Sequence, residues 1–260
     1  MRERIIFFGN GPLADETLRI LEQYCEVIFH AREKEDLTKV CELKREFPET
    51  HGVLASFGVI IREDVLELFE PEGILNIHPS LLPLYRGPSP IESAILAGDN
   101  DFSVSVMKLA PAMDAGPVYY QTTLHDLPLN KAEIYRALAE AGAKWIGKHL
   151  TNLPEPVSQD DSRATFCGKL DKTMSFLTPE TDTAEETLRK IVAFFGFPKA
   201  KYTFYGKICI ILEAHIVGVG ETPVLALPCA DGRILSIDLL QPEGRKVMDA
   251  KSFVNGYGTR

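Results

Sequence analysis

The sequence lacks several features that would place it in a specialised class of protein. No apolar run approaches the roughly 18 residues that a membrane-spanning helix needs, and the apolar part of the amino-terminal segment is too short for a signal peptide. The five cysteines form an odd set without C-x-x-C spacing, which argues against a disulfide framework and against a structural zinc site. They are Cys25, Cys41, Cys167, Cys209 and Cys229. We therefore expect a cytoplasmic protein with buried thiols, without a metal and without contact to a membrane.

Positive charge is also scarce. The formal net charge of the 260 residues is −9. Residues 163–260 carry 13 Lys or Arg against 11 Asp or Glu, a balance of +2, so residues 1–162 hold the other 15 basic and 26 acidic residues, a balance of −11. Only the last third of the chain could therefore favour a polyanion. A hydrophobic content of 45% is ordinary for a globular protein with one large or two smaller domains.

The first 150 residues alternate between apolar strand patterns and amphipathic helix patterns. Strands are expected at 4–8, 26–30, 52–60, 74–78, 103–109 and 118–121, and helices at 13–21, 34–47, 63–69, 89–98 and 130–145. This order predicts an α/β fold, with a Rossmann-like, mostly parallel sheet and helices on both faces. Ligands of such sheets bind at the carboxyl ends of the strands, where we expect Gly58, His78 and Asp114. The turn at Gly9-Asn10-Gly11 either contacts a ligand or only reverses the chain.

The second half of the chain has a different pattern. Residues 151–162 are polar and contain two prolines, which predicts a linker. A capping box at Thr183 begins one helix. Short strands then follow at hairpin spacing, at 202–205, 208–214, 224–227 and 234–240. We therefore expect a catalytic domain over 1–150, the linker, and a small OB-like β-barrel domain over 163–260.

The residues best suited to chemistry lie between 76 and 90. Asn76 and His78 share one face of a predicted strand, and a stiff turn rich in proline follows at once. Taken singly, these two side chains and Asp114, which lies in a turn-rich loop downstream, have ordinary structural explanations as turn formers or satisfied polar groups. Their combination and order favour catalysis instead.

A known family shares this order of residues. The run Asn76-x-His78-x-Ser80-Leu-Leu-Pro-x-x-x-Gly87, followed by Asp114 in an Asp-Ala-Gly-Pro loop, resembles the folate-dependent formyltransferases. Residues 240–248 resemble the closing segment of the carboxyl-terminal domain in the methionyl-tRNA formyltransferase branch. The resemblance therefore covers nearly the whole chain.

The resemblance implies a catalytic trio of Asn76, His78 and Asp114 and a formyl donor, 10-formyltetrahydrofolate. Formyl transfer to an amine passes through a tetrahedral intermediate that bears an oxyanion. Asn76 and a protonated His78 can donate to that oxygen, while Asp114 orients the imidazole and relays the proton of the amine. The folate is expected to contact Ser80, Leu81, Leu82 and Pro83 on one side and Phe57, Gly58 and Val59 on the other.

The resemblance also implies the amine substrate. It is the amino group of initiator methionyl-tRNA, bound by a monomer whose carboxyl-terminal domain contacts the nucleic acid. The candidate phosphate contacts are Lys199, Lys201, Lys207, Arg245, Lys246 and Lys251. Three departures from the branch keep other amines open: a long basic loop after the second strand is largely missing, Pro79 replaces glycine, and Phe102-Ser103 replaces Thr-Gly. The alternatives are a small amine, such as an amino-sugar nucleotide or glycinamide ribonucleotide, and a silent folate-binding module.

Overall fold

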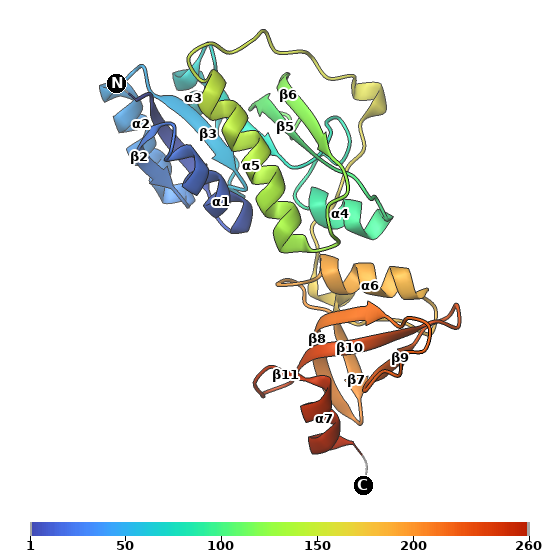
Figure 1. The fold of residues 1–260 in the computed structure, drawn as a ribbon. Coiled ribbons are helices and arrows are strands. Elements are labelled where there is room, and N and C mark those ends of the chain that lie inside the picture. The colour runs from blue at the N-terminus through green and yellow to red at the C-terminus, as the bar shows by residue number, and fades with distance from the viewer. Residues whose placement is uncertain (1, 259–260) are drawn as a thin grey trace. The chain divides into compact units, whose positions relative to one another are not determined.

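The computed structural model describes residues 2–258, and the chain divides into two compact units (Figure 1). The first unit contains the residues up to 91 together with 100–168. The second contains 92–99 together with the residues from 169 onward. The segment expected to be a linker, 151–162, thus clusters with the first unit. Within 2–258, no helix is both long enough and apolar enough to cross a membrane.

The first unit is built on a six-stranded sheet in the order β2-β1-β3-β4-β5-β6. Its strands are β1 (Arg4–Gly9), β2 (Glu26–Ala31), β3 (His51–Ala55), β4 (Ile74–His78), β5 (Phe102–Lys108) and β6 (Val118–Leu124). The first four strands are parallel, whereas β5 is antiparallel to β4 and β6 is antiparallel to β5. The prediction of a Rossmann-like, mostly parallel sheet is confirmed.

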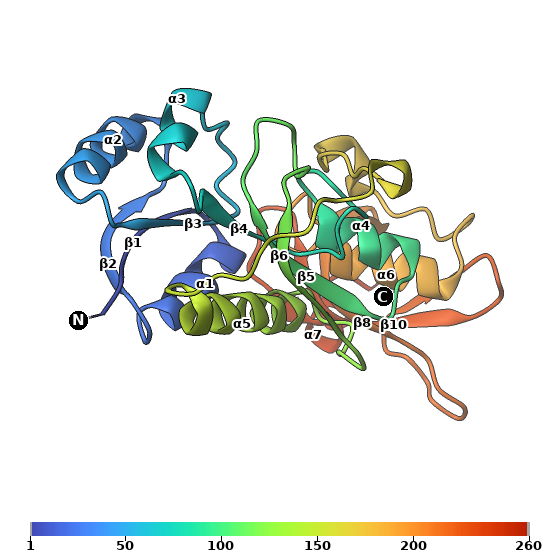
Figure 2. The same cartoon turned by 90° about the horizontal axis from the view of Figure 1, so that it is seen from above.

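Helices cover both faces of this sheet. They are α1 (Pro12–Leu21), α2 (Leu37–Glu46) after the 3-10 turn η1 (Lys34–Asp36), α3 (Glu63–Leu66) continuing into η2 (Glu67–Phe69), and α5 (Lys131–His149). Helix α4 (Pro90–Ala97) belongs for most of its length to the second unit. Figure 2 shows α1 and α5 on one side of the sheet and α2 and α3 on the other. The α5 helix starts at a side-chain cap, because Asn130 Oδ1 accepts hydrogen bonds from the amides of Ala132 (3.0 Å) and Glu133 (3.2 Å).

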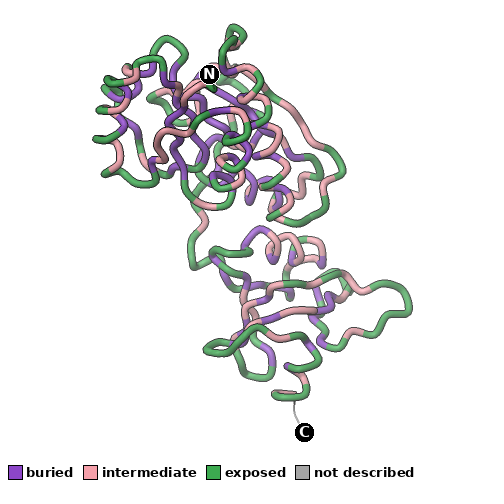
Figure 3. The backbone as a smooth tube through the Cα atoms, turned by 60° about the vertical axis from the view of Figure 1, so that its left-hand side comes forward, coloured by how far each residue is buried: buried purple, intermediate pink, exposed green. Residues whose placement is uncertain are grey.

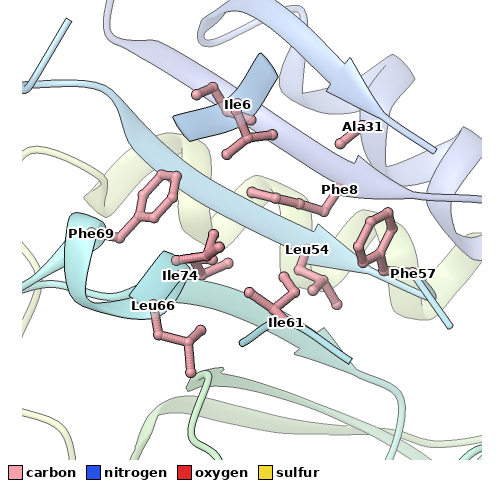
Figure 4. Packing of buried hydrophobic residues seen from close by; sticks show 11 residues of the cluster. Ile6, Phe8, Ala31, Leu54, Phe57, Ile61, Leu66, Phe69 and Ile74 are labelled. Carbon is pink, nitrogen blue, oxygen red and sulfur yellow. The ribbon is translucent and has the colours of Figure 1, made fainter. Parts of the chain in front are cut away.

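An apolar core lies between the sheet and the helices α2 and α3. Figure 4 shows Ile6, Leu54 and Ile74 from three neighbouring strands in one apolar cluster. The ring of Phe8 meets the rings of Phe57 and Phe69 edge to face, with centroids 5.6 and 6.0 Å apart. In Figure 3, buried residues (purple) lie mostly inside each unit and exposed residues (green) mostly along its outer turns.

The second unit is an antiparallel half-barrel, as predicted for the small carboxyl-terminal β domain. Its strands β7 (Lys201–Phe204), β8 (Lys207–Ile216), β10 (Ile234–Pro242) and β11 (Met248–Asp249) lie in the order β11-β10-β8-β7, and β9 (Ala226–Pro228) also pairs with β10. Helix α6 (Ala184–Ala193) packs on β8. The predicted capping box begins α6, since Thr183 and Glu186 exchange side-chain to backbone hydrogen bonds.

One helix was not expected from the sequence. Helix α7 (Ala250–Tyr257) follows β11 directly, and Asp249 caps it by accepting a hydrogen bond of 2.7 Å from the amide of Ser252. Phe253 of this helix is fully buried, and its ring lies 5.9 Å from that of Tyr205. An N-cap aspartate before apolar residues at 250, 253, 254 and 257 was the signal that could have predicted it. The five cysteines are free thiols, and Cys41 is the one that is not fully buried.

Candidate active site

Strand β4 ends at the residues expected to carry the chemistry. Asn76 and His78 are each 5% exposed. The imidazole of His78 has one acceptor near each nitrogen, with Nδ1 3.7 Å from Asp114 Oδ1 and Nε2 3.0 Å from the carbonyl oxygen of Tyr85. The structure therefore brings the side chains of His78 and Asp114 together, at a separation somewhat longer than a hydrogen bond.

Asp114 reaches His78 by a route that differs from the expected one. Because β5 is antiparallel to β4, with Leu75 opposite Lys108, the carboxyl end of β5 lies beside the start of β4. The two residues therefore do not share a carboxyl edge of parallel strands. Instead, loop 109–117 carries Asp114 back, and its Oδ2 accepts a hydrogen bond of 2.8 Å from the amide of Gly87.

The side chain of Asn76 is available to a ligand. Its two neighbours across the sheet are apolar, Leu54 on β3 and Met107 on β5. Within residues 2–258, no hydrogen bond to the Asn76 side chain is present. The amide atoms of Asn76 are not among the fully enclosed polar atoms without a partner, so they remain reachable from outside the protein. Asn76 is thus placed to donate to an oxygen atom of a substrate.

Side chains of the antiparallel strands hold the turn after His78. The hydroxyl of Ser105 donates to the carbonyl of Ser80 (2.6 Å) and accepts from the amide of Leu82 (3.1 Å). Gln121 donates to the carbonyl of Leu82 at 2.8 Å. Ser80 and Leu82 are buried, whereas Leu81 is 40% exposed. Leu81 therefore offers the apolar surface of this turn.

The other segment expected to contact folate is placed differently. Phe57 is 5% exposed with its ring against Phe8, and Val59 packs on the same core. Gly58 has a φ of +69°, and no atom lies within 4 Å of the position that a Cβ would take. A ligand at this segment would therefore contact the backbone of Gly58 rather than the ring of Phe57. The preceding residue, Ser56, also has a positive φ, of 52°.

Several residues that the sequence did not single out surround the site. Tyr85 has a φ of +55°, and its amide donates to the hydroxyl of Thr165 at 2.8 Å. Arg86 is 4% exposed, and its guanidinium donates to Gln159 (2.7 Å) and Asp161 (2.7 Å). Nothing in the local sequence distinguishes Gln159, Asp161 and Thr165 from solvent-exposed polar residues of a linker. Among the described residues, no group of three or more His, Cys, Asp or Glu is placed to hold a metal ion.

Comparisons with known proteins agree with these features. The family model described as "Formyl transferase" matches residues 14–150, and that described as "Formyl transferase, C-terminal domain" matches residues 169–258. The chain is 36% identical to the methionyl-tRNA formyltransferase of Dehalococcoides mccartyi (strain CBDB1) over 218 residues, which cover 78% of this chain and 69% of the relative. It is 31% identical to that of Campylobacter lari over 254 residues, which cover 94% and 82%.

A solved structure shares the fold at lower identity. HypX from Aquifex aeolicus, in complex with tetrahydrofolic acid, superposes with a TM-score of 0.75 at 17% identity. The match covers 98% of this chain and 47% of HypX.

Proposed function

Because the chain belongs to the formyl transferase family, we propose that it transfers the formyl group of 10-formyltetrahydrofolate to the amino group of methionyl-tRNA, giving formylmethionyl-tRNA for translation initiation. The observation that carries the chemistry is the His78–Asp114 pair beside the unpartnered amide of Asn76. The observation that favours this substrate is the similarity to methionyl-tRNA formyltransferases, which spans 94% of the chain in the Campylobacter lari relative.

In the proposed reaction, the nitrogen of the amine attacks the formyl carbon, and the carbonyl oxygen becomes an oxyanion. The Asn76 amide donates a hydrogen bond to this oxygen, and a donor of this kind is worth about 3 kcal/mol in a preorganised site. The imidazolium of His78 donates to the same oxygen once one of its N–H groups turns from the acceptor that it faces in this structure, Tyr85 O or Asp114 Oδ1. Asp114 holds the charged ring and takes the proton that the attacking nitrogen loses, directly or through water. The bond between the formyl carbon and N10 of the folate then breaks, and N10 takes up the proton that Asp114 accepted, directly or through water.

We expect the folate ring to lie on Leu81, the exposed residue of the turn 80–83. Replacing Leu81 with Asp puts a charge on this apolar surface, so the Kd for tetrahydrofolate should rise by about 10-fold or more. Calorimetry measures this directly. Leu129 is exposed to the same 40% and follows β6, so Leu129→Asp is the matched control and should bind like the native protein. Equal folate affinity of the Leu81 and Leu129 variants would show that Leu81 does not contact the folate.

The second unit supplies cations for the nucleic acid. Within residues 2–258, none of the six candidate phosphate contacts forms an ion pair within 4.0 Å. Several lie close together, because the amide of Glu243, just before Arg245 and Lys246, donates to the carbonyl of Ile208, which follows Lys207. Unpaired cations that gather on one unit are available to phosphates.

A side-by-side assay tests the substrate. Native protein with 10-formyltetrahydrofolate should formylate methionyl-tRNA, and log affinity should fall against log salt by roughly 0.7 to 0.9 per phosphate neutralised. The double variant Lys207→Glu/Lys246→Glu should bind tRNA more weakly with a smaller salt slope. Lys39→Glu, which changes a lysine already paired with Glu42, is the control and should behave like the native protein. If the double variant keeps the native slope of log affinity against log salt, Lys207 and Lys246 do not contact the tRNA.

One observation favours a small amine instead. Between β2 and β3, residues 32–50 form η1 and α2 and carry five basic and six acidic residues, so this segment supplies no net positive charge. An amino-sugar nucleotide and glycinamide ribonucleotide therefore belong in the same assay. Turnover of either one without turnover of methionyl-tRNA would replace the proposed substrate and leave the formyl-transfer chemistry intact.

A further inference from the structure

The chain that leaves the catalytic sheet after α5 is hydrogen-bonded back onto the candidate active site. Val157 exchanges two backbone hydrogen bonds, both 2.8 Å, with Val118 at the start of β6. Further along, Arg86 donates its amide to Thr165 (2.9 Å) and accepts on its carbonyl from Cys167 (2.8 Å). Residues 157–167, which we call the brace, therefore contact both loops that flank His78.

Gln159 is the residue of the brace that touches the loop of Asp114. Its side-chain Nε2 donates to the carbonyl oxygens of Asp114 (2.8 Å) and Gly116 (2.7 Å). Its Oε1 accepts from Nε (3.1 Å) and Nη2 (2.7 Å) of Arg86. An amide offers two donor hydrogens and two acceptor lone pairs, so this side chain is fully used. One residue thus links the loop between β5 and β6 to the buried arginine next to Gly87.

The loop of Asp114 needs such an anchor. Residues 111–113 are exposed, and Met113 is 64% exposed, so the loop has little apolar packing of its own. Asp114 itself has a φ of +50°, which is unfavourable for a residue other than glycine. The two bonds from Gln159 hold the backbone at Asp114 itself and two residues further along, and thus the turn from which the Asp114 carboxylate approaches His78.

We propose that Gln159 is a positioning residue for Asp114, an inference that rests on the proposed catalytic role of that carboxylate. Gln159 touches no reacting atom, and it acts by holding two carbonyl oxygens. The competing explanation is that Gln159 serves only to satisfy the guanidinium of Arg86. The two explanations differ in which half of the amide matters, the donor half or the acceptor half.

An isosteric substitution separates the two halves. Gln159→Glu keeps an oxygen for Arg86 but replaces the donating Nε2 with an oxygen that faces two carbonyls. A misplacement of about 1 Å at a catalytic group can cost on the order of 100-fold in rate, so we expect kcat to fall by about 10 to 100-fold with KM for the folate unchanged. Asp161→Asn alters the other, 78% exposed acceptor of Arg86 and is the matched control, with kcat within about 2-fold of native.

The experiment measures formyl transfer to whichever amine the native protein accepts. Turnover is divided by the number of tetrahydrofolate-binding sites found by calorimetry, so that loss of folded protein cannot imitate a loss of kcat. Asp114→Ala is included in the same series. Native turnover of Asp114→Ala would remove the catalytic role of Asp114 and thus the proposed mechanism. An inactive Asp114→Ala beside a Gln159→Glu with native kcat would overturn the positioning role alone, as would an equal loss in Asp161→Asn.

Discussion

The alanine variants of His78 and Asp114 are each expected to turn over at least about 100-fold more slowly than the native protein, with little change in folate affinity. The reason is that, in the proposed mechanism, both groups act on charge that develops in the transition state, whereas the proposed folate contacts lie in the turn at 80–83. Removing either partner leaves the other nearly buried without its counterpart at 3.7 Å. Steady-state kinetics with the true amine substrate, together with calorimetry of tetrahydrofolate, measures the two quantities separately.

A second histidine provides the control for this experiment. His125 lies just after β6, is 65% exposed, and has its Nδ1 3.0 Å from Asp101. It therefore forms a similar pair away from the candidate site, and His125→Ala should keep native turnover. The catalytic assignment fails if the His78 or Asp114 variant also retains near-native turnover.

Gly87→Ala is expected to damage both the stability and the activity of the protein. Gly87 has a φ of +124°, and an added Cβ would lie 2.3 Å from the carbonyl oxygen of Cys167 in the brace. Overlap with a backbone atom, added to a conformation that side chains avoid, should lower the free energy of unfolding by about 3 kcal/mol or more. The amide of Gly87 donates to Asp114, so kcat should also fall by about 100-fold. Denaturant unfolding and steady-state kinetics measure these effects.

Gly206 allows the effect of the overlap to be separated from that of the backbone angle. Its φ is +70°, and no atom lies within 4 Å of its Cβ position. Gly206→Ala should therefore cost only about 1 kcal/mol of stability and leave kcat unchanged. If the alanine variants at 87 and 206 lose the same stability, the brace does not pack against the loop as closely as the structure indicates.

The sequence predicted those parts of the structure that depend on nearby residues. The alternation of strands and helices was sufficient for the mostly parallel sheet, and the capping box at Thr183 was sufficient for the start of α6. The approach of His78 and Asp114 was expected from the family resemblance, and the structure places the two side chains 3.7 Å apart. The alternation of strands and helices and the capping box each have a short-range physical cause, namely strand periodicity and side-chain capping.

The remaining features depend on partners that are distant in the sequence. The antiparallel direction of β5 follows from its pairing with β4, and an alternating pattern cannot specify that direction. Gln159 lies 45 residues from Asp114, in a polar, proline-containing stretch typical of linkers. Phe57 has an aromatic side chain that could line a ligand site as well as a core, and only its packing on Phe8 decides between them. These placements are tertiary, and periodicity carries no information about them.

The loops beside the candidate site contain three non-glycine residues with left-handed backbone, Ser56, Tyr85 and Asp114, and this has a consequence for how the protein could be stabilised. Each gives up about 1 kcal/mol relative to an ordinary conformation, which is a considerable part of a typical folding free energy of about 5 to 15 kcal/mol. The substitution Tyr85→Gly would relieve that cost. It would also loosen the backbone at residue 85, whose carbonyl accepts a hydrogen bond from His78. Selection for heat resistance and selection for turnover therefore oppose each other at this loop, and thermostable variants should carry their changes elsewhere.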